Sequence, residues 1–103
     1  MREHKNLIIV ASGGFDPLHS GHITYLQKAK ELCGTLIVIL NNDNWLRAKK
    51  GYAFMPEQER MTILKALRDV DKVILTKHKP NTTDLSVCDA ITELNSSIKI
   101  DVF

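Results

Sequence analysis

The sequence predicts an α/β protein with a Rossmann-like, open parallel sheet. Two continuously apolar runs, LIIVA at 7–11 and TLIVIL at 35–40, are rich in β-branched residues. Such runs are typical of strands that are buried on both faces. A helical pattern lies between them, so residues 7–40 form a strand–helix–strand unit. Because strands and helices continue to alternate further along the chain, we expect a sheet with helical crossovers.

The bulk properties narrow the class of protein. The chain has 103 residues, enough for one domain, and is 44% hydrophobic and 25% charged. A net charge of +2 is too small to indicate a nucleic-acid or membrane partner. No apolar run is long enough to span a bilayer, and no apolar segment of the length found in a signal peptide follows MREHKN. Cys33 and Cys88 form no CxxC pair, so we expect a cytoplasmic protein with reduced thiols.

The first helix is predicted from about Gly21 to a stop at Gly34. Its apolar stripe comprises Tyr25, Leu26, Ala29, Leu32 and Cys33. Residues 41–55 are polar and contain RAKKG, which predicts a long loop.

Pro56 suits the first position of the next helix, with Glu57 and Glu59 in its first turn. The apolar face of that helix is Ile63, Leu64 and Leu67.

The remaining elements are shorter. KVIL at 72–75 predicts a third strand, and KHKPNTT, with Lys77, His78 and Lys79, predicts a solvated connection. Residues 84–94 predict a weaker helix, and IKIDVF at 98–103 predicts the start of a fourth strand. The apolar face of the weaker helix would be Leu85, Cys88, Ile91 and Leu94.

The loop SGGFDPLHSGH, which leaves the carboxyl end of the first strand, is the candidate site. Gly13 and Gly14 allow a sharp bend and a close approach of a ligand to the backbone. Gly21 and His22 start a helix, where free N–H groups and the dipole favour an anion. His22 lies four residues before Leu26 on the buried stripe, so its ring should lean toward the strand ends. There it could converge with His19 on one point and stabilise charge on a phosphoryl group.

Less specific interpretations of this loop stay open. An H-x-x-H pair could hold zinc, but no third Cys or His ligand is close in the sequence. Asp16 could be only a turn residue before Pro17. The combination of these residues, after a buried strand and before a helix, is more specific than any part of it.

The segment GGFDPLHSGH resembles the GxFDxxHxGH signature of the cytidylyltransferase-like nucleotidyltransferases, which share HxGH with class I aminoacyl-tRNA synthetases. The segment from Asn41 to Val73 also looks like the middle section of that family. There a lysine in a mobile loop precedes a helix with an E-R pattern and a VD-V strand. The resemblance implies a reaction in which the phosphate of a small substrate attacks the α-phosphorus of ATP or CTP. Pyrophosphate leaves, and no covalent enzyme intermediate forms.

The resemblance also implies roles for particular residues. His19 and His22 would stabilise the transition state, and Lys49 or Lys50, the latter as a catalytic residue, would reach the triphosphate. Arg60 would hold phosphate or position the lysine segment. Gly13, Gly14, Phe15 and Gly21 would contact the nucleotide through the backbone, and Asp16 would fix the loop and the substrate side. Mg²⁺ would bridge phosphate oxygens, with no metal ligand from the protein.

Three further side chains have a second interpretation. Lys49 and Lys50 could be a solvated pair. Asp43 could bind a substrate group, although an Asx turn is the simpler role. Trp45 could stack on a base, although packing is the simpler role.

Relatives of this family continue past a strand like IDVF, so residues 1–103 should form one nucleotidyltransferase domain that lacks its C-terminal part. MPEQERMTILKALRDVD looks closest to heptose-phosphate adenylyltransferases, then to glycerol-phosphate cytidylyltransferases, and archaeal-type flavin-nucleotide synthases are also similar. The expected partners are a nucleoside triphosphate and a small phosphorylated substrate, with no nucleic acid, no membrane and a possible homodimer. The alternatives are a nucleotide-binding module without catalysis and a fragment related to a tRNA synthetase, for which no KMSKS loop is present.

Overall fold

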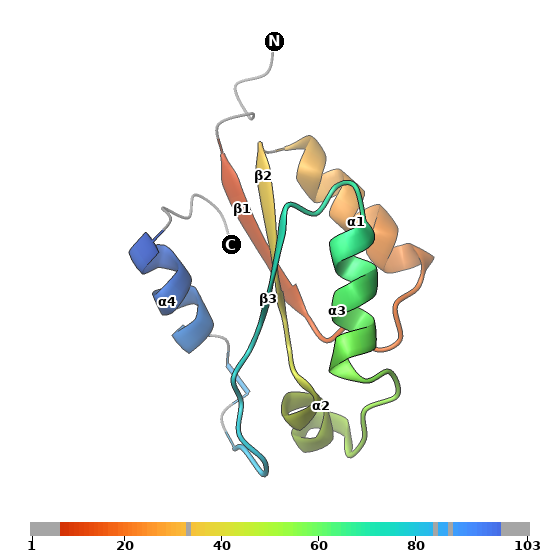
Figure 1. The fold of residues 1–103 in the computed structure, drawn as a ribbon, viewed down its shortest axis with the longest axis vertical. Helices are drawn as coiled ribbons and strands as arrows, with labels where there is room; N and C mark the ends of the chain where they lie inside the picture. The colour runs from red at the N-terminus through yellow and green to blue at the C-terminus, as the bar shows by residue number, and fades with distance from the viewer. Residues whose placement is uncertain (1–6, 33, 84, 87, 98–103) are drawn as a thin grey trace.

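The computed structural model describes residues 7–32, 34–83, 85–86 and 88–97. Strands and helices alternate along the chain (Figure 1), which confirms the predicted α/β class. The elements are β1 (Ile8–Gly13), α1 (Ser20–Glu31), β2 (Thr35–Leu40), α2 (Asp43–Lys50), α3 (Glu57–Ala66), β3 (Lys72–Leu75) and α4 (Cys88–Ser97).

The three described strands form one parallel sheet in the order β1-β2-β3. Ile8 pairs with Thr35 at one end of the sheet and Gly13 pairs with Leu40 at the other, while Leu40 also pairs with Leu75. The central strand β2 is the most deeply buried, because it has a neighbour on each side and helices on both faces. The strands at 35–40 and 72–75 are confirmed, and the first strand extends two residues beyond its predicted end.

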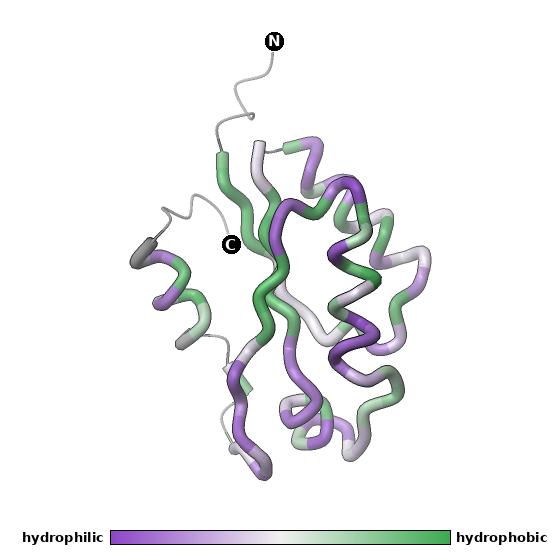
Figure 2. Tube along the Cα trace, viewed as in Figure 1, coloured by the Kyte–Doolittle hydropathy of each residue, from purple (hydrophilic) through white to green (hydrophobic). Residues whose placement is uncertain are grey.

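Helices cover both faces of the sheet (Figure 1). On one face, α1 and α3 pack over a core that includes Leu26, Leu36 and Leu64. On the other face, α4 packs through Leu94 against Val10 and Ile37. The strands are therefore hydrophobic along most of their length (Figure 2), while the segments that follow β2 and β3 are polar.

The prediction of a loop over 41–55 is wrong, because α2 occupies Asp43–Lys50. The Asn42 side chain caps this helix and accepts the Trp45 N–H at 2.9 Å. Gly51 ends it in the left-handed conformation, with φ of 88°. Leu46 is the buried residue of α2, so the helix carries too little apolar periodicity to be found by its pattern.

Other predicted boundaries need smaller corrections. The first helix ends at Glu31 with Leu32 as its cap, and Tyr25 and Leu32 are exposed rather than part of the buried stripe. Pro56 occupies the N-cap position, one residue before the first position of α3, which the sequence predicted for it. Glu57 and Glu59 lie in the first turn as predicted.

The last helix begins at Cys88, so Leu85 lies before it. The predicted fourth strand, Cys33 and the side chain of Cys88 fall outside the described residues. Within the described ranges, none of the helices has the length and apolar character needed to cross a membrane.

Candidate active site

The two histidines of the loop cap the first turn of α1 and stack on each other. His19 is the N-cap residue, and its Nδ1 accepts the Gly21 N–H at 3.0 Å. His22 Nδ1 in turn accepts the His19 N–H at 3.3 Å, which completes a reciprocal capping box. The ring centroids lie 4.0 Å apart with an angle of 26° between the planes. The structure thus brings together the two imidazoles that sequence spacing expected to converge.

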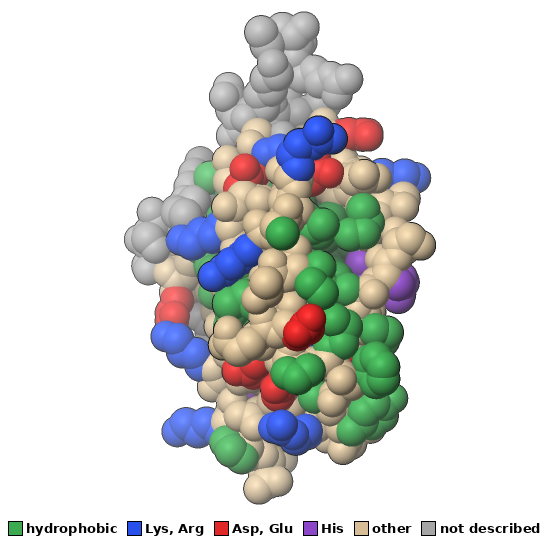
Figure 3. All heavy atoms as spheres, turned by 45° about the vertical axis from the view of Figure 1, so that its right-hand side comes forward, with side chains coloured by type: hydrophobic (Ala, Val, Ile, Leu, Met, Phe, Trp, Pro, Cys, Tyr) green, Lys and Arg blue, Asp and Glu red, His purple; other side chains and the backbone are tan. Residues whose placement is uncertain are grey.

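Their hydrogen bonds define the tautomer of both rings. Because each Nδ1 accepts an N–H, the proton of each neutral imidazole is on Nε2. Burial, and then the nearby His19 ring, lower the pKa of His22 below its ordinary value, which favours the neutral form at neutral pH. Neither Nε2 donates to an acceptor in the described part of the chain. His19 is exposed and His22 is half-buried, so these two N–H donors can face a ligand. Histidine side chains are also visible at the surface in Figure 3.

The Phe15 ring packs against the His22 ring. Phe15 is buried and adopts a positive φ of 52°, which is uncommon for a residue with a side chain. Its ring meets the His22 ring edge-on at a centroid distance of 5.0 Å. A Cβ on Gly13 would lie 3.1 Å from the Phe15 ring, and a Cβ on Gly14 would lie 3.0 Å from Leu46. The two glycines therefore make room for Phe15 and for α2.

Backbone donors are available in the same loop. The N–H groups of Gly14 and Phe15 have no hydrogen-bond acceptor among the residues that the structure describes. Gly21 differs, since its N–H is already bonded to His19, and a Cβ there would lie 2.9 Å from His19 Cε1. Gly14 and Phe15 are thus the better placed backbone donors for a phosphate oxygen, whereas Gly21 leaves room for the His19 ring.

Asp16 joins the histidine loop to the segment between α2 and α3. Its carboxylate is 1% exposed and lies 3.0 Å from Lys50 Nζ, which also donates to the Asp16 carbonyl oxygen at 2.9 Å. The N–H groups of Phe54 and Met55 donate to the same carboxylate. Burial alone would raise the pKa of Asp16, but the hydrogen bonds and the Lys50 charge outweigh it and lower the pKa below its ordinary value. Asp16 is more than a turn residue, because it holds Lys50 beside the histidine loop.

Arg60 is fully buried, with 0% of its side chain exposed. Its guanidinium spans three segments of the chain. Nε donates to the Met55 carbonyl oxygen at 2.8 Å. Nη1 donates to the carbonyl oxygens of Gly14 at 2.7 Å and Asn41 at 2.6 Å. Nη2 pairs with Asp43 Oδ1 at 2.6 Å. Of its two expected roles, positioning the lysine segment fits these contacts better than direct binding of phosphate.

Three other candidate residues, Asp43, Trp45 and Lys49, belong to α2 and make different contacts. Lys49 is exposed and lies over the Trp45 ring, 5.4 Å from its centroid, while the Trp45 indole N–H donates to the Leu85 carbonyl. Trp45 is therefore a packing residue here. Asp43 pairs with Arg60, and the cap of α2 is made by Asn42. Of the two lysines, it is Lys50 that lies beside the histidine loop. It belongs to the last turn of α2, whereas the sequence predicted a loop there.

Three polar residues at the ends of β2 and β3 were missed by the sequence analysis. Thr76 is buried, and its hydroxyl accepts the Asn42 N–H at 3.0 Å. His78 bridges Thr76 and Ser86 through its two ring nitrogens, so the segment 77–79 is not the purely solvated connection that the sequence predicted. Asn41 is buried with its Oδ1 unpaired in the described part of the chain. Their only signal in the sequence is their position just after an apolar strand.

No three His, Cys, Asp or Glu side chains come together in a metal-binding arrangement within the described ranges. The histidine pair has two stacked rings whose Nδ1 atoms are already engaged by backbone N–H groups. These contacts suit hydrogen-bond donation from Nε2 to an anion better than ligation of zinc.

Comparison with known proteins agrees with this geometry. The model of the cytidylyltransferase-like family matches residues 10–103. FAD synthase of Pyrococcus horikoshii is 37% identical over 86 residues, which are 82% of this chain and 58% of that protein. The bifunctional protein HldE of Helicobacter pylori is 40% identical over 77 residues, which are 73% of this chain and 17% of that protein. This chain thus spans only part of the length of these relatives.

One solved structure shares the fold. A lipopolysaccharide core biosynthesis protein from Thermoplasma volcanium superposes with a TM-score of 0.67 at 24% identity, covering 93% of each chain. At that identity the likeness supports the Rossmann-like arrangement alone. The family model matches most of the chain, and the identity to FAD synthase is 37%; these two findings establish the family as well as the fold. The chain belongs to the cytidylyltransferase-like family of nucleotidyltransferases.

Proposed function

We propose that this protein transfers a nucleotidyl group from a nucleoside triphosphate to the phosphate of a small phosphorylated substrate and releases pyrophosphate. The observation that carries the proposal is the stacked pair of His19 and His22. Two neutral imidazoles at the start of α1 hold Nε2–H donors that have no acceptor in the described residues. Such donors suit the negative charge that develops around the α-phosphorus during transfer.

In this proposal each residue of the loop has a defined task. His19 and His22 donate hydrogen bonds to oxygens of the α-phosphate, and the N–H groups of Gly14 and Phe15 supply further donors. Lys50 leaves or shares its contact with Asp16 to neutralise the triphosphate. Arg60 is a positioning residue, because its contacts tie the histidine loop to α2 and none of them leaves a donor at the surface.

Mg²⁺ is proposed to enter with the triphosphate and to be held mainly by phosphate oxygens, where it would neutralise charge during transfer. The Asp16 carboxylate, which is 1% exposed, is occupied by Lys50 and by two backbone N–H groups. The expected cytoplasmic location and the possible homodimer stay predictions.

ATP and FMN are the first substrates to test. A relative named FAD synthase supports adenylyl transfer onto FMN, since joining AMP to FMN forms the FAD pyrophosphate bond. The surface beside Lys50 fits a planar acceptor, because Tyr52 is 57% exposed and Phe54 is 67% exposed. Lys50 Nζ lies 4.8 Å from the centroid of the Tyr52 ring. Exposed aromatic faces can stack on an isoalloxazine ring, whereas a sugar would gain less from them. A heptose phosphate is the second candidate acceptor, on the likeness to HldE.

The test is pyrophosphate release by the full chain, with ATP or CTP paired with FMN or a heptose phosphate. We expect turnover with ATP and FMN, and a loss of about 10²-fold or more in His22→Ala. Lys28→Ala is the matched control, since Lys28 is an exposed residue toward the other end of α1. Binding of ATP without turnover of any acceptor would favour the non-catalytic module. Turnover with the heptose phosphate alone would exclude the flavin assignment.

A further inference from the structure

Met55 lies between the histidine loop and the buried side chain of Arg60, and it contacts both. Its sulfur accepts the Leu18 N–H at 3.5 Å, although the two residues are 37 positions apart in the sequence. Its backbone N–H donates to the Asp16 carboxylate, and its carbonyl oxygen accepts Arg60 Nε–H at 2.8 Å. Side chain and backbone of this one residue thus hold three separate partners.

The sulfur contact acts on the candidate site through the chain itself. Leu18 immediately precedes His19, the N-cap residue of α1, whose ring belongs to the stacked pair. The backbone of Met55 is held by Asp16 through its N–H and by Arg60 through its carbonyl oxygen. Because this backbone is fixed, a change at the Met55 sulfur is transmitted to Leu18 and His19.

Met55 is also within reach of solvent. It is half-buried in the segment between α2 and α3, and the residues on both sides of it, Phe54 and Pro56, are exposed. Met61, the other methionine in the described part of the chain, packs from α3 against the hydrophobic core. Oxidation turns an apolar thioether into a polar sulfoxide, which a packed core disfavours. Met55 is therefore the more reactive of these two methionines.

Oxidation would change the contact between Met55 and Leu18. Hydrogen peroxide transfers one oxygen to a lone pair of the sulfur, its O–O bond breaks, and the other oxygen leaves as water with both hydrogens; the sulfur is oxidised by two electrons. An N–H···O bond alone spans about 2.9 Å between nitrogen and oxygen. The new oxygen therefore cannot enter the 3.5 Å between Leu18 N and the sulfur without moving them apart. An oxygen on the other lone pair leaves an electron-poor sulfur, which is a weaker acceptor. Both epimers of the sulfoxide thus weaken or lengthen the contact.

We propose that Met55 is a peroxide-sensitive modification site, and that its conversion to the sulfoxide displaces the histidine loop and lowers nucleotidyl transfer. The effect on turnover rests on the function proposed above, whereas the modification and the displacement do not. Methionine sulfoxide reductases restore the thioether, so the modification is reversible. Met55 is a positioning residue, because it acts on the reacting groups through Leu18 and His19.

The first test treats the ¹⁵N-labelled full chain with hydrogen peroxide and follows it by peptide mass spectrometry and NMR. We expect the sulfoxide to form at Met55 before Met61. The amide signals of Leu18 and His19 should shift in proportion to the oxidised fraction of Met55. They should return to their original positions after treatment with methionine sulfoxide reductases for both epimers.

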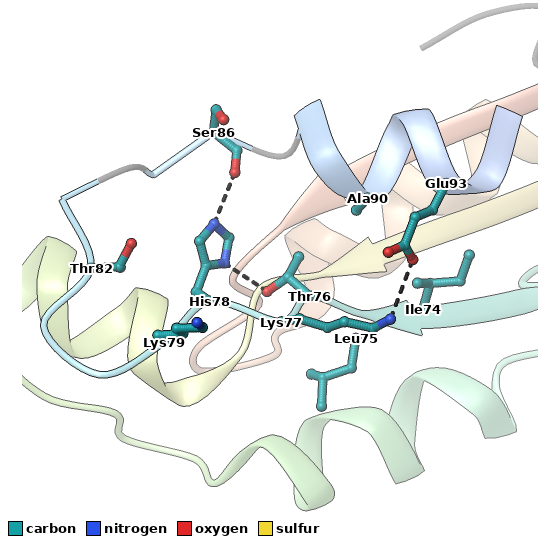
Figure 4. A pocket seen from close by; sticks show the side chains of 10 residues that line it. All are labelled: Ile74, Leu75, Thr76, Lys77, His78, Lys79, Thr82, Ser86, Ala90 and Glu93. Carbon is teal, nitrogen blue, oxygen red and sulfur yellow. Dashed lines mark hydrogen bonds and ion pairs between the residues drawn. The ribbon is translucent and has the colours of Figure 1, made fainter. Parts of the chain in front are cut away.

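The polar contacts at the end of β3 provide an internal reference for this experiment. His78 Nδ1 lies 2.9 Å from the Thr76 hydroxyl, and Nε2 lies 2.8 Å from the Ser86 carbonyl oxygen (Figure 4). These contacts contain no sulfur and lie on the side of the sheet that α4 covers. The amide signals of Thr76 and His78 should therefore stay unshifted while Met55 is oxidised.

The second test compares turnover with ATP and FMN before and after peroxide in the wild type, Met55→Leu and Met61→Leu. Each protein is compared with its own untreated sample. The wild type and Met61→Leu should lose about 10²-fold in turnover, the cost of misplacing a reacting group by about 1 Å, whereas Met55→Leu should keep its turnover. Cys33 and Cys88 are present in all three proteins, so oxidation of a cysteine would lower all three alike.

Three outcomes would overturn the proposal. Met61 could be oxidised before Met55, the signals of Leu18 and His19 could stay unshifted in the Met55 sulfoxide, or Met55→Leu could lose as much turnover as the wild type. If the untreated wild type turns over no acceptor, the function proposed above fails, while the mass spectra and the NMR shifts still decide the modification and the displacement. If Met55→Leu does not fold, reversal by the reductases in the wild type decides whether a methionine sulfoxide causes the loss.

Discussion

Replacing Arg60 with methionine tests whether this residue is a structural connector or a phosphate ligand. The substitution keeps much of the apolar volume and removes every donor. It would leave the Gly14, Asn41 and Met55 carbonyl oxygens without their present donor and Asp43 without its counter-ion. Three of these contacts tie the histidine loop, the end of β2 and α2 to α3, and the fourth fixes Met55, just before α3.

The expected loss of stability is large for a chain of this size. Each carbonyl that loses its donor costs about 1 kcal/mol. Breaking a buried ion pair by removing one partner costs about 3–5 kcal/mol. Because one side chain makes all these contacts, the losses are not additive, and we expect a loss of about 4 kcal/mol in the free energy of unfolding. A chain of this length typically has only about 5–15 kcal/mol in total.

The assay is urea unfolding followed by circular dichroism, with Arg60→Lys as the conservative variant. Lysine keeps the charge but cannot reach all four acceptors, so its loss should be intermediate. A methionine variant with an unchanged urea midpoint and a large loss of ATP affinity would refute the structural role. It would assign Arg60 to phosphate binding instead.

Three further predictions concern the loop and its neighbours. Asp16→Asn should lower stability at pH 7. Because the folded pKa of Asp16 lies below its ordinary value of 3.8, the carboxylate stabilises the wild type above about pH 4 and loses this effect at lower pH. The two proteins should therefore converge in unfolding scans toward pH 2, and a constant difference would contradict the ion pair. Gly21→Ala should cut turnover with little change in melting temperature, because its Cβ would displace the His19 ring; normal turnover would show that the ring position is unimportant. Gly51→Ala should cost about 1 kcal/mol from backbone strain alone, since a Cβ there meets no atom within 4 Å, and Gly51→Asn should cost less in the same urea assay.

The sheet could be predicted from the sequence because its strands are continuous apolar runs. Buried parallel strands need apolar side chains on both faces, and TLIVIL provides them without interruption. The helix α2 could not be found in this way, because its buried contact is made mainly by Leu46. Tertiary contacts hold it, including a hydrogen bond from the Asp43 N–H to Glu57 at 2.8 Å. Its capping residues, Asn42 and Gly51, were the available signals.

The histidine loop was predictable for a different reason. His19 and His22 are three residues apart at a helix start, so local geometry alone brings their rings together. The partners of Asp16 and Arg60 come from segments that are far apart in the sequence, such as Phe54 for Asp16 and Gly14 for Arg60. Spacing along the chain contains no information about such contacts, so the burial of Arg60 became visible only in the fold.

The central claim is that a nucleotide binds at His19 and His22. Isothermal titration of the full chain with Mg²⁺ and ATP, beside His22→Ala and the control Lys28→Ala, tests it most directly. We expect saturable binding to the wild type and to Lys28→Ala, and an affinity at least about tenfold weaker in His22→Ala, because a charge-assisted hydrogen bond is lost. Equal affinity of the wild type and His22→Ala, or no binding of ATP or CTP to the wild type, would contradict it.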